Sequence, residues 1–314
     1  MTEPGAVLLD EAEPVSATRR LLALPGQLVR TARPRQWVKN LLVVAAPAAA
    51  GRLTRPHVIA QLSMVFVLFT AAASAVYLIN DARDAEADRA HPDKCHRPVA
   101  AGKVPVGVAY AAGGTLAVLA PLAAALTCNA MTATLLTGYV VMQLAYCVKL
   151  KHVLVVDLVV VTTGFLMRAM TGGVALGIPL SRWFLITAGF GALFMVSAKR
   201  YSEALQMEGR GAATRSLLDA YTTGYLRFVW QLAAGVAVLA YCMWALESGG
   251  VSGGSLLPWR QLSMVPFIGA ILRYAVFADR GSAGAPEDVV LHDRALAVIG
   301  LGWVAMYALA VADL

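Results

Sequence analysis

Long apolar runs separated by short polar stretches dominate the pattern of this chain. Many of these runs are long enough to cross the roughly 30 Å hydrocarbon core of a bilayer as an α-helix. The strict apolar and polar alternation that a membrane β-barrel requires is absent from the sequence. The pattern therefore predicts an all-α, polytopic membrane protein.

Nine membrane-spanning helices are predicted from these runs. The first and sixth are short, and Pro47 interrupts the first, so these two are expected to be tilted or partly interfacial. The nine spans are about Trp37–Ala50, Gln61–Ile79, Val104–Thr127, Ala130–Val148, Val153–Ala175, Trp183–Ala198, Gly224–Leu246, Gln261–Ala278 and Ala295–Val311.

The composition agrees with this pattern, because 59% of the 314 residues are hydrophobic and only 14% are charged. Residues 1–16 are expected to form a disordered tail. Residues 17–36 mix Leu and Val with basic side chains, so we expect them to lie along the membrane surface. Residues 37–314 then form a single transmembrane domain.

Most of the 26 Lys and Arg residues fall in the N-terminal segment and in the loops that follow even-numbered spans. An excess of these residues marks the cytoplasmic side of a membrane protein. The N-terminus and these loops are therefore predicted to be cytoplasmic, in a multi-pass protein of the cell membrane. This asymmetry accounts for the net charge of +7 without a nucleic-acid partner. The four cysteines lack metal-site spacing, so neither zinc nor a disulfide framework is predicted.

An acidic cluster, NDARDAEAD, begins where the second span reaches its cytoplasmic edge. On a continuous helix three of its four acids share one face with an amide and an aromatic ring, whereas Arg83 and Glu86 point elsewhere. Like charges at this spacing repel each other, so a bound Mg²⁺ shared with substrate phosphates is the natural partner. The alternative is a solvated loop in which nearby Lys and Arg neutralise the acids. The face carries Tyr77, Asn80, Asp81, Asp84 and Asp88.

This cluster resembles the NDxxDxxxD motif of the UbiA-type intramembrane prenyltransferase superfamily. The nine spans and the large inner loops after the second and sixth are similar to that superfamily too. The resemblance implies a UbiA-like bundle with an active-site cavity on the cytoplasmic side. It also assigns Asp81, Asp84 and Asp88 to Mg²⁺ that holds a diphosphate, with Asn80 beside them.

A second acidic motif of the superfamily, DxxxD after the fourth span, is matched only in part by YCVKLKHVLVVDLVVV. Its first acid is Asp157, but Val161 stands at the second acid position. Because ionising a prenyl diphosphate usually needs both acid clusters to hold the departing charge, this change argues against that chemistry. One branch of the superfamily fits the change. RPRQWVKNLLVVAAP, GFLMRAMTGG, SAKRYSE and YLRFVW resemble the decaprenyl-phosphate phosphoribosyltransferase branch.

That branch implies transfer of 5-phosphoribosyl from 5-phosphoribosyl-1-diphosphate to decaprenyl or another polyprenyl phosphate in arabinan precursor synthesis. The polyprenyl phosphate would itself attack the anomeric carbon, so catalysis needs positioning and charge stabilisation rather than a side-chain nucleophile. Residues 37–314 would then be the catalytic domain. The catalytic candidates are Asp84, Asp88 and Asp157, and the cofactor is Mg²⁺. The substrate-binding candidates are Asn80, Asp81, Arg97, Tyr146, Lys149, Lys151, Arg168, Lys199 and Arg200.

Several of these cations have a structural alternative. Lys149 and Lys151 flank a span end and would anchor it to anionic headgroups. Lys199 would pair with Glu203 one helical turn away. Arg168 lies deep in the fifth span, where a charge costs roughly 2.5–3.5 kcal/mol on insertion scales, so it must face the bundle. Both a structural and a functional contact stay open for Arg168.

Two other functions also stay open. The first is an aromatic or quinone-precursor prenyltransferase of the same superfamily, against which Val161 argues. The second is a lipid-phosphate transporter. Transporters commonly place ionisable residues near the membrane midplane, whereas nearly all the acids of this chain lie on one surface.

Overall fold

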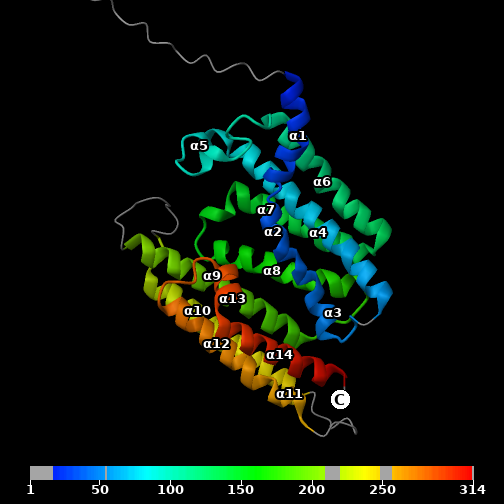
Figure 1. Ribbon diagram of the computed structural model, residues 1–314, viewed down its shortest axis with the longest axis vertical. Coiled ribbons are helices and arrows are strands. Elements are labelled where there is room, and N and C mark those ends of the chain that lie inside the picture. The colour runs from blue at the N-terminus through cyan, green and yellow to red at the C-terminus, as the bar shows by residue number, and fades with distance from the viewer. Residues whose placement is uncertain (1–16, 54, 209–219, 248–256, 313–314) are drawn as a thin grey trace, which may run out of the picture.

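The computed structural model describes residues 17–53, 55–208, 220–247 and 257–312, and these residues form helices joined by short connections (Figure 1). This confirms the all-α prediction. The predicted tail, residues 1–16, lies outside the described residues. The elements are α1 (Ala17–Thr31), α2 (Pro34–Trp37), η1 (Val38–Val44), α3 (Ala45–Ala49), α4 (Pro56–Arg83), α5 (Ala85–Arg89), η2 (Lys94–His96), α6 (Val106–Thr127), α7 (Ala130–Val148), η3 (Leu150–His152), α8 (Val156–Ala175), α9 (Arg182–Glu208), α10 (Thr223–Glu247), α11 (Trp259–Leu262), α12 (Met264–Asp279), α13 (Pro286–His292) and α14 (Arg294–Ala312).

Seven helices in the described part of the chain are long and apolar enough to cross a membrane, whereas nine spans are predicted from the sequence. The predicted first span is instead a broken run of short pieces, α2, η1 and α3, in which Pro47 stands inside the last piece. The predicted sixth span lies within the longer α9, whose second half carries Lys199, Arg200 and Glu203. The seven are α4, α6, α7, α8, α10, α11 together with α12, and α14.

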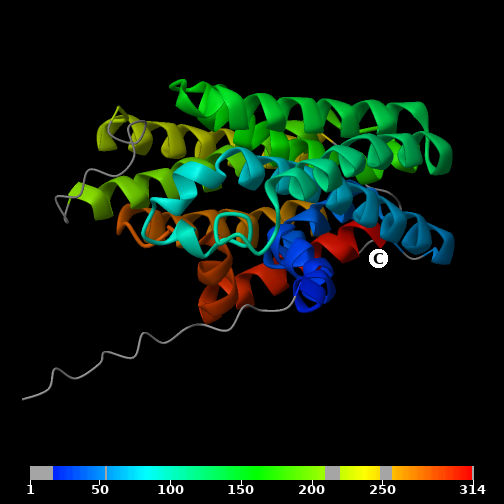
Figure 2. The same cartoon turned by 90° about the horizontal axis from the view of Figure 1, so that it is seen from above.

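Helix α8 lies between two apolar cores. One core joins η1, α4, α6 and α7 to the end of α8, and Phe69 and Leu136 are among its fully buried side chains. The other joins the start of α8 to α9, α10, α12, α13 and α14, around Phe194 and Leu226. In Figure 2 the long helices run side by side across the view, with α14 in red on the same side as the dark-blue α1. Helix α8 therefore contacts both halves of the bundle.

The first helical pieces approach α8 at a pair of glycines. A Cβ atom added at Gly172 would overlap the carbonyl oxygen of Val43 in η1. A Cβ atom at Gly173 would lie 2.9 Å from the Cβ of Ala46 in α3. The backbones of η1 and α8 can meet this closely because Gly172 has no side chain.

Substitution of Gly172 by Ala is expected to force η1 away from α8 and to lower the free energy of unfolding by about 1–3 kcal/mol. The matched control is Gly114→Ala in α6, because a Cβ atom there would meet nothing within 4 Å. That control should stabilise the helix by about 0.5–1 kcal/mol. Unfolding of both variants in detergent, followed by circular dichroism, checks the prediction. Equal stability of the two variants would contradict it.

Helix α1 packs on the end of α4 rather than standing free. Leu24 and Leu28 contact a small core that contains Ala82, Ala85 and Val99. Leu22, by contrast, is 78% exposed. The helix therefore has one face against the bundle, while Leu22 and Val29 face outward. The surface location of residues 17–36 stays a prediction.

Candidate active site

The acidic cluster begins at the end of α4, where the helix breaks. Asp84 has φ −88° and ψ 6°, and α5 starts at the next residue. This corrects the single continuous helix that the sequence pattern assumes. The backbone N–H groups of Asp84 and Asp88 still donate to the carbonyls four residues earlier, at 2.9 and 2.8 Å. The acids consequently stay together, and Asn80 lies half-buried beside them at the end of α4.

Two arginines from outside the cluster neutralise its buried carboxylates. Asp81 and Asp88 are only 2% and 3% exposed. Arg33, from the turn between α1 and α2, donates from Nη2 to Asp81 Oδ1 at 2.6 Å. Arg97 donates from Nη1 to Asp88 Oδ2 at 2.7 Å and lies 3.4 Å from Asp81 Oδ1. The guanidinium of Arg33 also lies 4.8 Å from the centre of the Tyr77 ring.

Asp84 differs from its neighbours, because its side chain is 26% exposed. Its partner is Lys151 of η3, whose Nζ lies 3.5 Å from Asp84 Oδ2. Arg83 points the other way and donates to the carbonyls of Cys147 and Val148, which ties the end of α4 to the end of α7. The connection after α7 therefore reaches the acidic cluster.

The second acid, Asp157, stands in the first turn of α8 and is 2% exposed. Tyr146 of α7 donates from its hydroxyl to Asp157 Oδ1 at 2.5 Å. Arg200 of α9 donates from Nη2 to the same oxygen at 3.2 Å and from Nη1 to Glu203 at 3.2 Å. Lys199 lies 3.9 Å from Glu203, which is the helix pair foreseen as its structural alternative.

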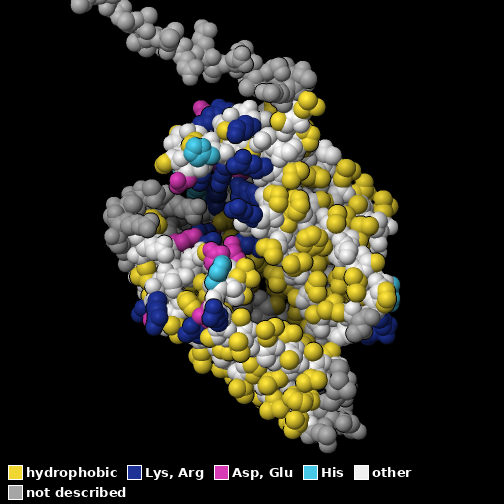
Figure 3. Space-filling model, viewed as in Figure 1, with side chains coloured by type: hydrophobic (Ala, Val, Ile, Leu, Met, Phe, Trp, Pro, Cys, Tyr) yellow, Lys and Arg dark blue, Asp and Glu magenta, His cyan; other side chains and the backbone are white. Residues whose placement is uncertain are grey.

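These contacts join the two acid groups through one helix end. Tyr146 binds Asp157, and Lys151, five residues later, binds Asp84. Lys149 is exposed at the end of α7 between these two contacts. Figure 3 shows Lys and Arg side chains gathered around a hollow on this face, with Asp and Glu at its lower edge, while hydrophobic side chains cover much of the rest. The arrangement can hold a ligand that carries several negative charges.

Val161 stands one turn after Asp157, at the position where the superfamily motif has its second acid. It packs against the apolar core that contains Leu158 and Phe194. Val161 is half-buried and presents an apolar side chain one turn after Asp157. Asp157 is the acidic residue in the first turn of α8.

Arg168 lies in the middle of α8 and is only 7% exposed. Its guanidinium donates to Asn40 Oδ1 at 3.0 Å, to the Gly164 carbonyl at 3.0 Å and to the Tyr139 hydroxyl at 2.8 Å. Asn40 in turn donates to Thr70 at 3.0 Å. These contacts join η1, α4, α7 and α8, and they favour the structural alternative for Arg168. Substrate contact by Arg168 stays a prediction.

Sequence reasoning missed two polar residues beside these groups. Arg33 is 48 residues from Asp81, so no local spacing signals their contact. Tyr221, just before α10, accepts a hydrogen bond at 2.7 Å from the backbone N–H of Val155. Burial raises the pKa of Tyr221, and the charge of Asp157 acts in the same direction.

Asp81, Asp84 and Asp88 carry the carboxylate oxygens that Mg²⁺ prefers as ligands. Within the described residues, no group of three or more His, Cys, Asp or Glu side chains is gathered at metal-binding distance. Mg²⁺ commonly uses only one or two carboxylates together with waters and substrate phosphates, and Asp84, which is partly exposed and lies 3.5 Å from Lys151, fits that pattern. The donor set therefore fits Mg²⁺ shared with a substrate. Joint metal binding by Asp81, Asp84 and Asp88 stays a prediction.

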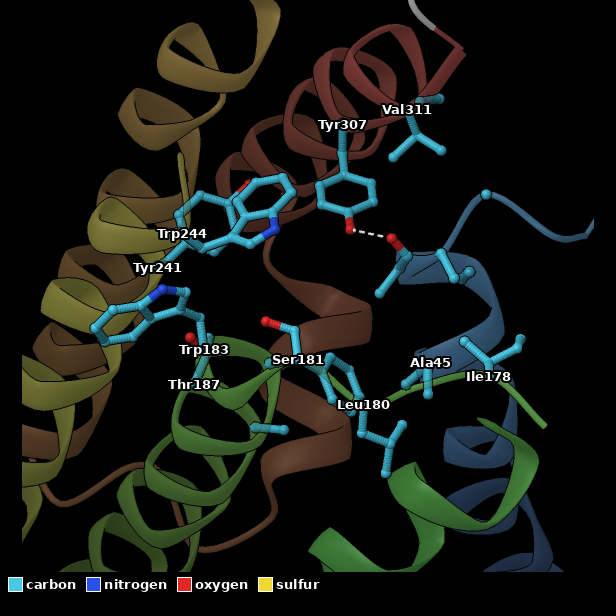
Figure 4. Close-up of a pocket in the computed structure, with 18 of the residues that line it drawn as sticks. Ala45, Ile178, Leu180, Ser181, Trp183, Thr187, Tyr241, Trp244, Tyr307 and Val311 are labelled. Carbon is cyan, nitrogen blue, oxygen red and sulfur yellow. Dashed lines mark hydrogen bonds between the residues drawn. The ribbon is translucent and has the colours of Figure 1, made fainter. Parts of the chain in front are cut away.

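A separate apolar cavity of about 920 Å³ lies near the other end of α8. It is lined by α3, the connection from α8 to α9, and parts of α9, α10, α12 and α14, with Trp183, Trp244 and Tyr307 among its aromatic residues (Figure 4). The Tyr307 hydroxyl donates to the Ala49 carbonyl at 2.9 Å. Tyr241 is hydrogen-bonded to Ser263 and accepts from the indole of Trp303, each at 2.8 Å. The hydroxyls of Tyr241 and Tyr307 and the indole N–H of Trp303 are thus satisfied within the protein.

A bundle of membrane-spanning helices, with acids and cations from several helices gathered at one end, defines an intramembrane protein of the UbiA type. Residues 41–299 match the UbiA prenyltransferase family, and the chain belongs to that family.

Among curated proteins, the chain is 51% identical over 293 residues to the decaprenyl-phosphate phosphoribosyltransferase of Mycobacterium tuberculosis, covering 92% of this chain and 95% of that protein. It is 47% identical to the enzyme of the same name from Corynebacterium glutamicum, over 92% of this chain and 87% of that protein.

Solved structures share the fold at low sequence identity. A UbiA homologue from Archaeoglobus fulgidus bound to GPP and Mg²⁺ matches with a TM-score of 0.66 and 16% identity, covering 92% of this chain and all of that one. A digeranylgeranylglyceryl phosphate synthase matches with a TM-score of 0.64 and 17% identity, covering 94% of this chain and 99% of that one. These matches confirm the predicted UbiA-like bundle.

Proposed function

We propose that this protein transfers a 5-phosphoribosyl group from 5-phosphoribosyl-1-diphosphate to a polyprenyl phosphate such as decaprenyl phosphate, with release of diphosphate. The identity of about 50% to decaprenyl-phosphate phosphoribosyltransferases over most of both chains supports this. The observation that carries the proposal is the apolar packing of Val161 beside Asp157. Helix α8 supplies one acid of this motif, Asp157, rather than the two acids associated with prenyl diphosphate ionisation.

The reaction asks the protein to position two anions and to stabilise departing charge. A phosphate oxygen of the acceptor forms a bond to the anomeric carbon, and the bond from that carbon to the diphosphate breaks. The diphosphate leaves with the electron pair. A phosphate monoester is already ionised near neutral pH, so no side chain has to remove a proton from it. Catalysis then depends on placement and electrostatics.

The acidic cluster is assigned to the diphosphate end of the donor. Mg²⁺ held by Asp84 and Asp88, with Asp81 and Asn80 beside them, would supply positive charge to the departing diphosphate. The A. fulgidus homologue bound to GPP and Mg²⁺ supports a divalent metal in this fold. Arg97 already lies at 2.7 Å from Asp88 and would keep that carboxylate in place.

The cations around the hollow are assigned to the remaining phosphates. The donor carries a 5-phosphate and the acceptor a phosphate monoester, and both need positive partners. Arg200 is held by Asp157 and Glu203, and a guanidinium fork suits bidentate phosphate contact. Lys149 directly after α7, Lys151 in η3 and Lys199 in α9 would add point charges. Tyr146 would keep Asp157 oriented through its hydroxyl.

The apolar cavity at the other end of α8 is assigned to the isoprenoid chain of the acceptor. Helix α8 has 20 residues between the two regions, or about 30 Å at 1.5 Å per residue. A long polyprenyl chain spans this length, and an apolar aromatic lining suits it because burial of such a chain is hydrophobic. The phosphate would then stay with the cations while the chain enters the bundle.

Filling this cavity is expected to weaken acceptor binding selectively. Thr187→Phe places a ring into the cavity, where Thr187 is one of the lining residues. We expect KM for polyprenyl phosphate to rise about tenfold, as for a loss near 1.4 kcal/mol, while KM for the donor stays unchanged. Thr137→Phe on the exposed surface of α7 is the control. A similar rise in both variants would contradict the assignment.

The membrane orientation follows from the same proposal. The seven candidate spans support a multi-pass membrane protein. We place the protein in the plasma membrane with its N-terminus, the acidic cluster and the catalytic domain of residues 37–314 opening to the cytoplasm, where most Lys and Arg residues lie. Labelling of a cysteine introduced at exposed Glu86 by a membrane-impermeant reagent, in intact cells and in inverted vesicles, tests this orientation. Labelling only in intact cells would reverse it.

The deciding experiment supplies two substrate pairs to the purified protein in lipid. Release of diphosphate from 5-phosphoribosyl-1-diphosphate with decaprenyl phosphate, together with a phosphoribosylated lipid, is the expected result. Release only from a prenyl diphosphate with 4-hydroxybenzoate would overturn the proposal in favour of an aromatic prenyltransferase. Movement of lipid phosphate across liposomes without a covalent product would instead indicate a transporter.

A further inference from the structure

A strained residue stands directly before α8. Val155 has φ 68° and ψ −45°, and it is one of two non-glycine residues with positive φ in the described part of the chain. A β-branched residue rarely adopts this region, because its side chain clashes with the backbone there. The conformation persists only where surrounding contacts hold it.

The contact that holds Val155 comes from a distant part of the chain. Its side chain is 48% exposed, so packing contributes little. Its backbone N–H donates to the hydroxyl of Tyr221 at 2.7 Å, across 66 residues of sequence. Tyr221 is itself 6% exposed and belongs to the core that includes Leu158. Its ring is stacked on Tyr225, with centroids 5.8 Å apart.

The strained residue controls how α8 begins. The carbonyl of Val155 accepts the N–H of Val159 at 3.0 Å, and Asp157 N–H donates to the Val153 carbonyl at 3.1 Å. Asp157 thus lies two residues beyond the strained backbone and inside the same turn. A relaxed φ at Val155 would rotate this turn and move the Asp157 carboxylate relative to Tyr146, which belongs to another helix.

We propose that Tyr221 is a positioning residue, whose hydroxyl holds Val155 in its strained conformation and thereby fixes the Asp157 carboxylate against Tyr146 and Arg200. This inference rests on the proposed function, because it assumes that Asp157 acts in phosphoribosyl transfer. The segment before α10 then takes part in catalysis through backbone geometry, without touching the substrate.

The test combines a hydroxyl deletion with relief of strain. Tyr221→Phe removes only the acceptor oxygen, and we expect kcat to fall about tenfold while KM for polyprenyl phosphate stays within twofold. Val155→Gly should restore activity in the double variant, because glycine adopts positive φ without the support of the hydroxyl. Tyr221→Phe/Val155→Gly is therefore expected to return to within about twofold of Val155→Gly alone.

A second readout does not depend on turnover. Hydrogen exchange of the Val155 amide, followed by mass spectrometry of short peptides, should quicken in Tyr221→Phe and stay slow in Tyr225→Phe, the matched control from the same stacked pair. Unchanged exchange, wild-type kcat in Tyr221→Phe, or no rescue by Val155→Gly overturns the inference. A wild-type protein that is inactive on the proposed substrates would instead overturn the proposed function. The exchange experiment would still test whether the Tyr221 hydroxyl protects the Val155 amide.

Discussion

Replacement of Asp84 by Asn is expected to reduce phosphoribosyl transfer by about 10³-fold, because it removes the most accessible carboxylate assigned to the diphosphate. Asp84 and Lys151 are both partly exposed and lie 3.5 Å apart, so their ion pair contributes little to stability. The fold should therefore survive while turnover is lost. Initial rates measured across a Mg²⁺ titration check this result, since the variant should no longer respond to the metal.

The control removes a more exposed, ion-paired carboxylate elsewhere. Asp279 pairs with Arg227 at 3.2 Å, with side chains 60% and 49% exposed, and stands apart from the acidic cluster. Asp279→Asn should keep both wild-type turnover and the Mg²⁺ response. Near wild-type activity in Asp84→Asn would refute the role of Asp84 in metal and diphosphate binding.

Replacement of Asp157 by Asn is expected to cost about 10²–10³-fold in kcat, through loss of charge at a fixed position. Asn has nearly the same shape, and its carbonyl oxygen can still accept from both Tyr146 and Arg200, which share Asp157 Oδ1. The interaction with Arg200 becomes weaker, because a neutral amide attracts a guanidinium less than a carboxylate does. Steady-state kinetics with each substrate varied in turn check the prediction.

Comparing Asp157→Asn with Asp157→Ala separates the effect of the carboxylate charge from the effect of its buried hydrogen bonds. Asp157→Ala leaves the buried Tyr146 hydroxyl and the Arg200 guanidinium without their common acceptor, so it should also lower the melting temperature in detergent. If Asp157→Asn kept more than half of the wild-type kcat, the carboxylate would have no part in the reaction. If both variants melted like the wild type, the buried contacts would not stabilise the bundle.

The sequence was most informative about long apolar helices. Six of the predicted spans match α4, α6, α7, α8, α10 and α14 to within about five residues at each end, because a run of apolar residues has few other folds in a bilayer. It was least informative where chain geometry changes within a few residues. The break at Asp84 and the short pieces between Pro34 and Ala49 depend on packing against other helices, which no periodicity encodes.

The sequence predicted which acidic and basic residues belong to the candidate site, but not which acid pairs with which base. Asp81, Asp84, Asp88 and Asp157 form ion pairs with Arg97, Lys151 and Arg200, and their part in the reaction stays a prediction. The pairing itself depends on which helix ends meet, so Arg33 could not be matched to Asp81 from spacing alone. Tyr221 gave no signal either, since its role rests on one backbone N–H group.

The contacts of Arg168 have a consequence for how the chain enters the membrane during synthesis. A central arginine would add roughly 2.5–3.5 kcal/mol to insertion of α8 by itself. Asn40 and Tyr139, which accept from Arg168, and Thr70, which accepts from Asn40, all precede Arg168 in sequence, so ribosomes finish them before α8 emerges. Helix α8 can therefore leave the translocon against helices that already offer hydrogen-bond acceptors, and biogenesis of the second half of the bundle depends on completion of the first.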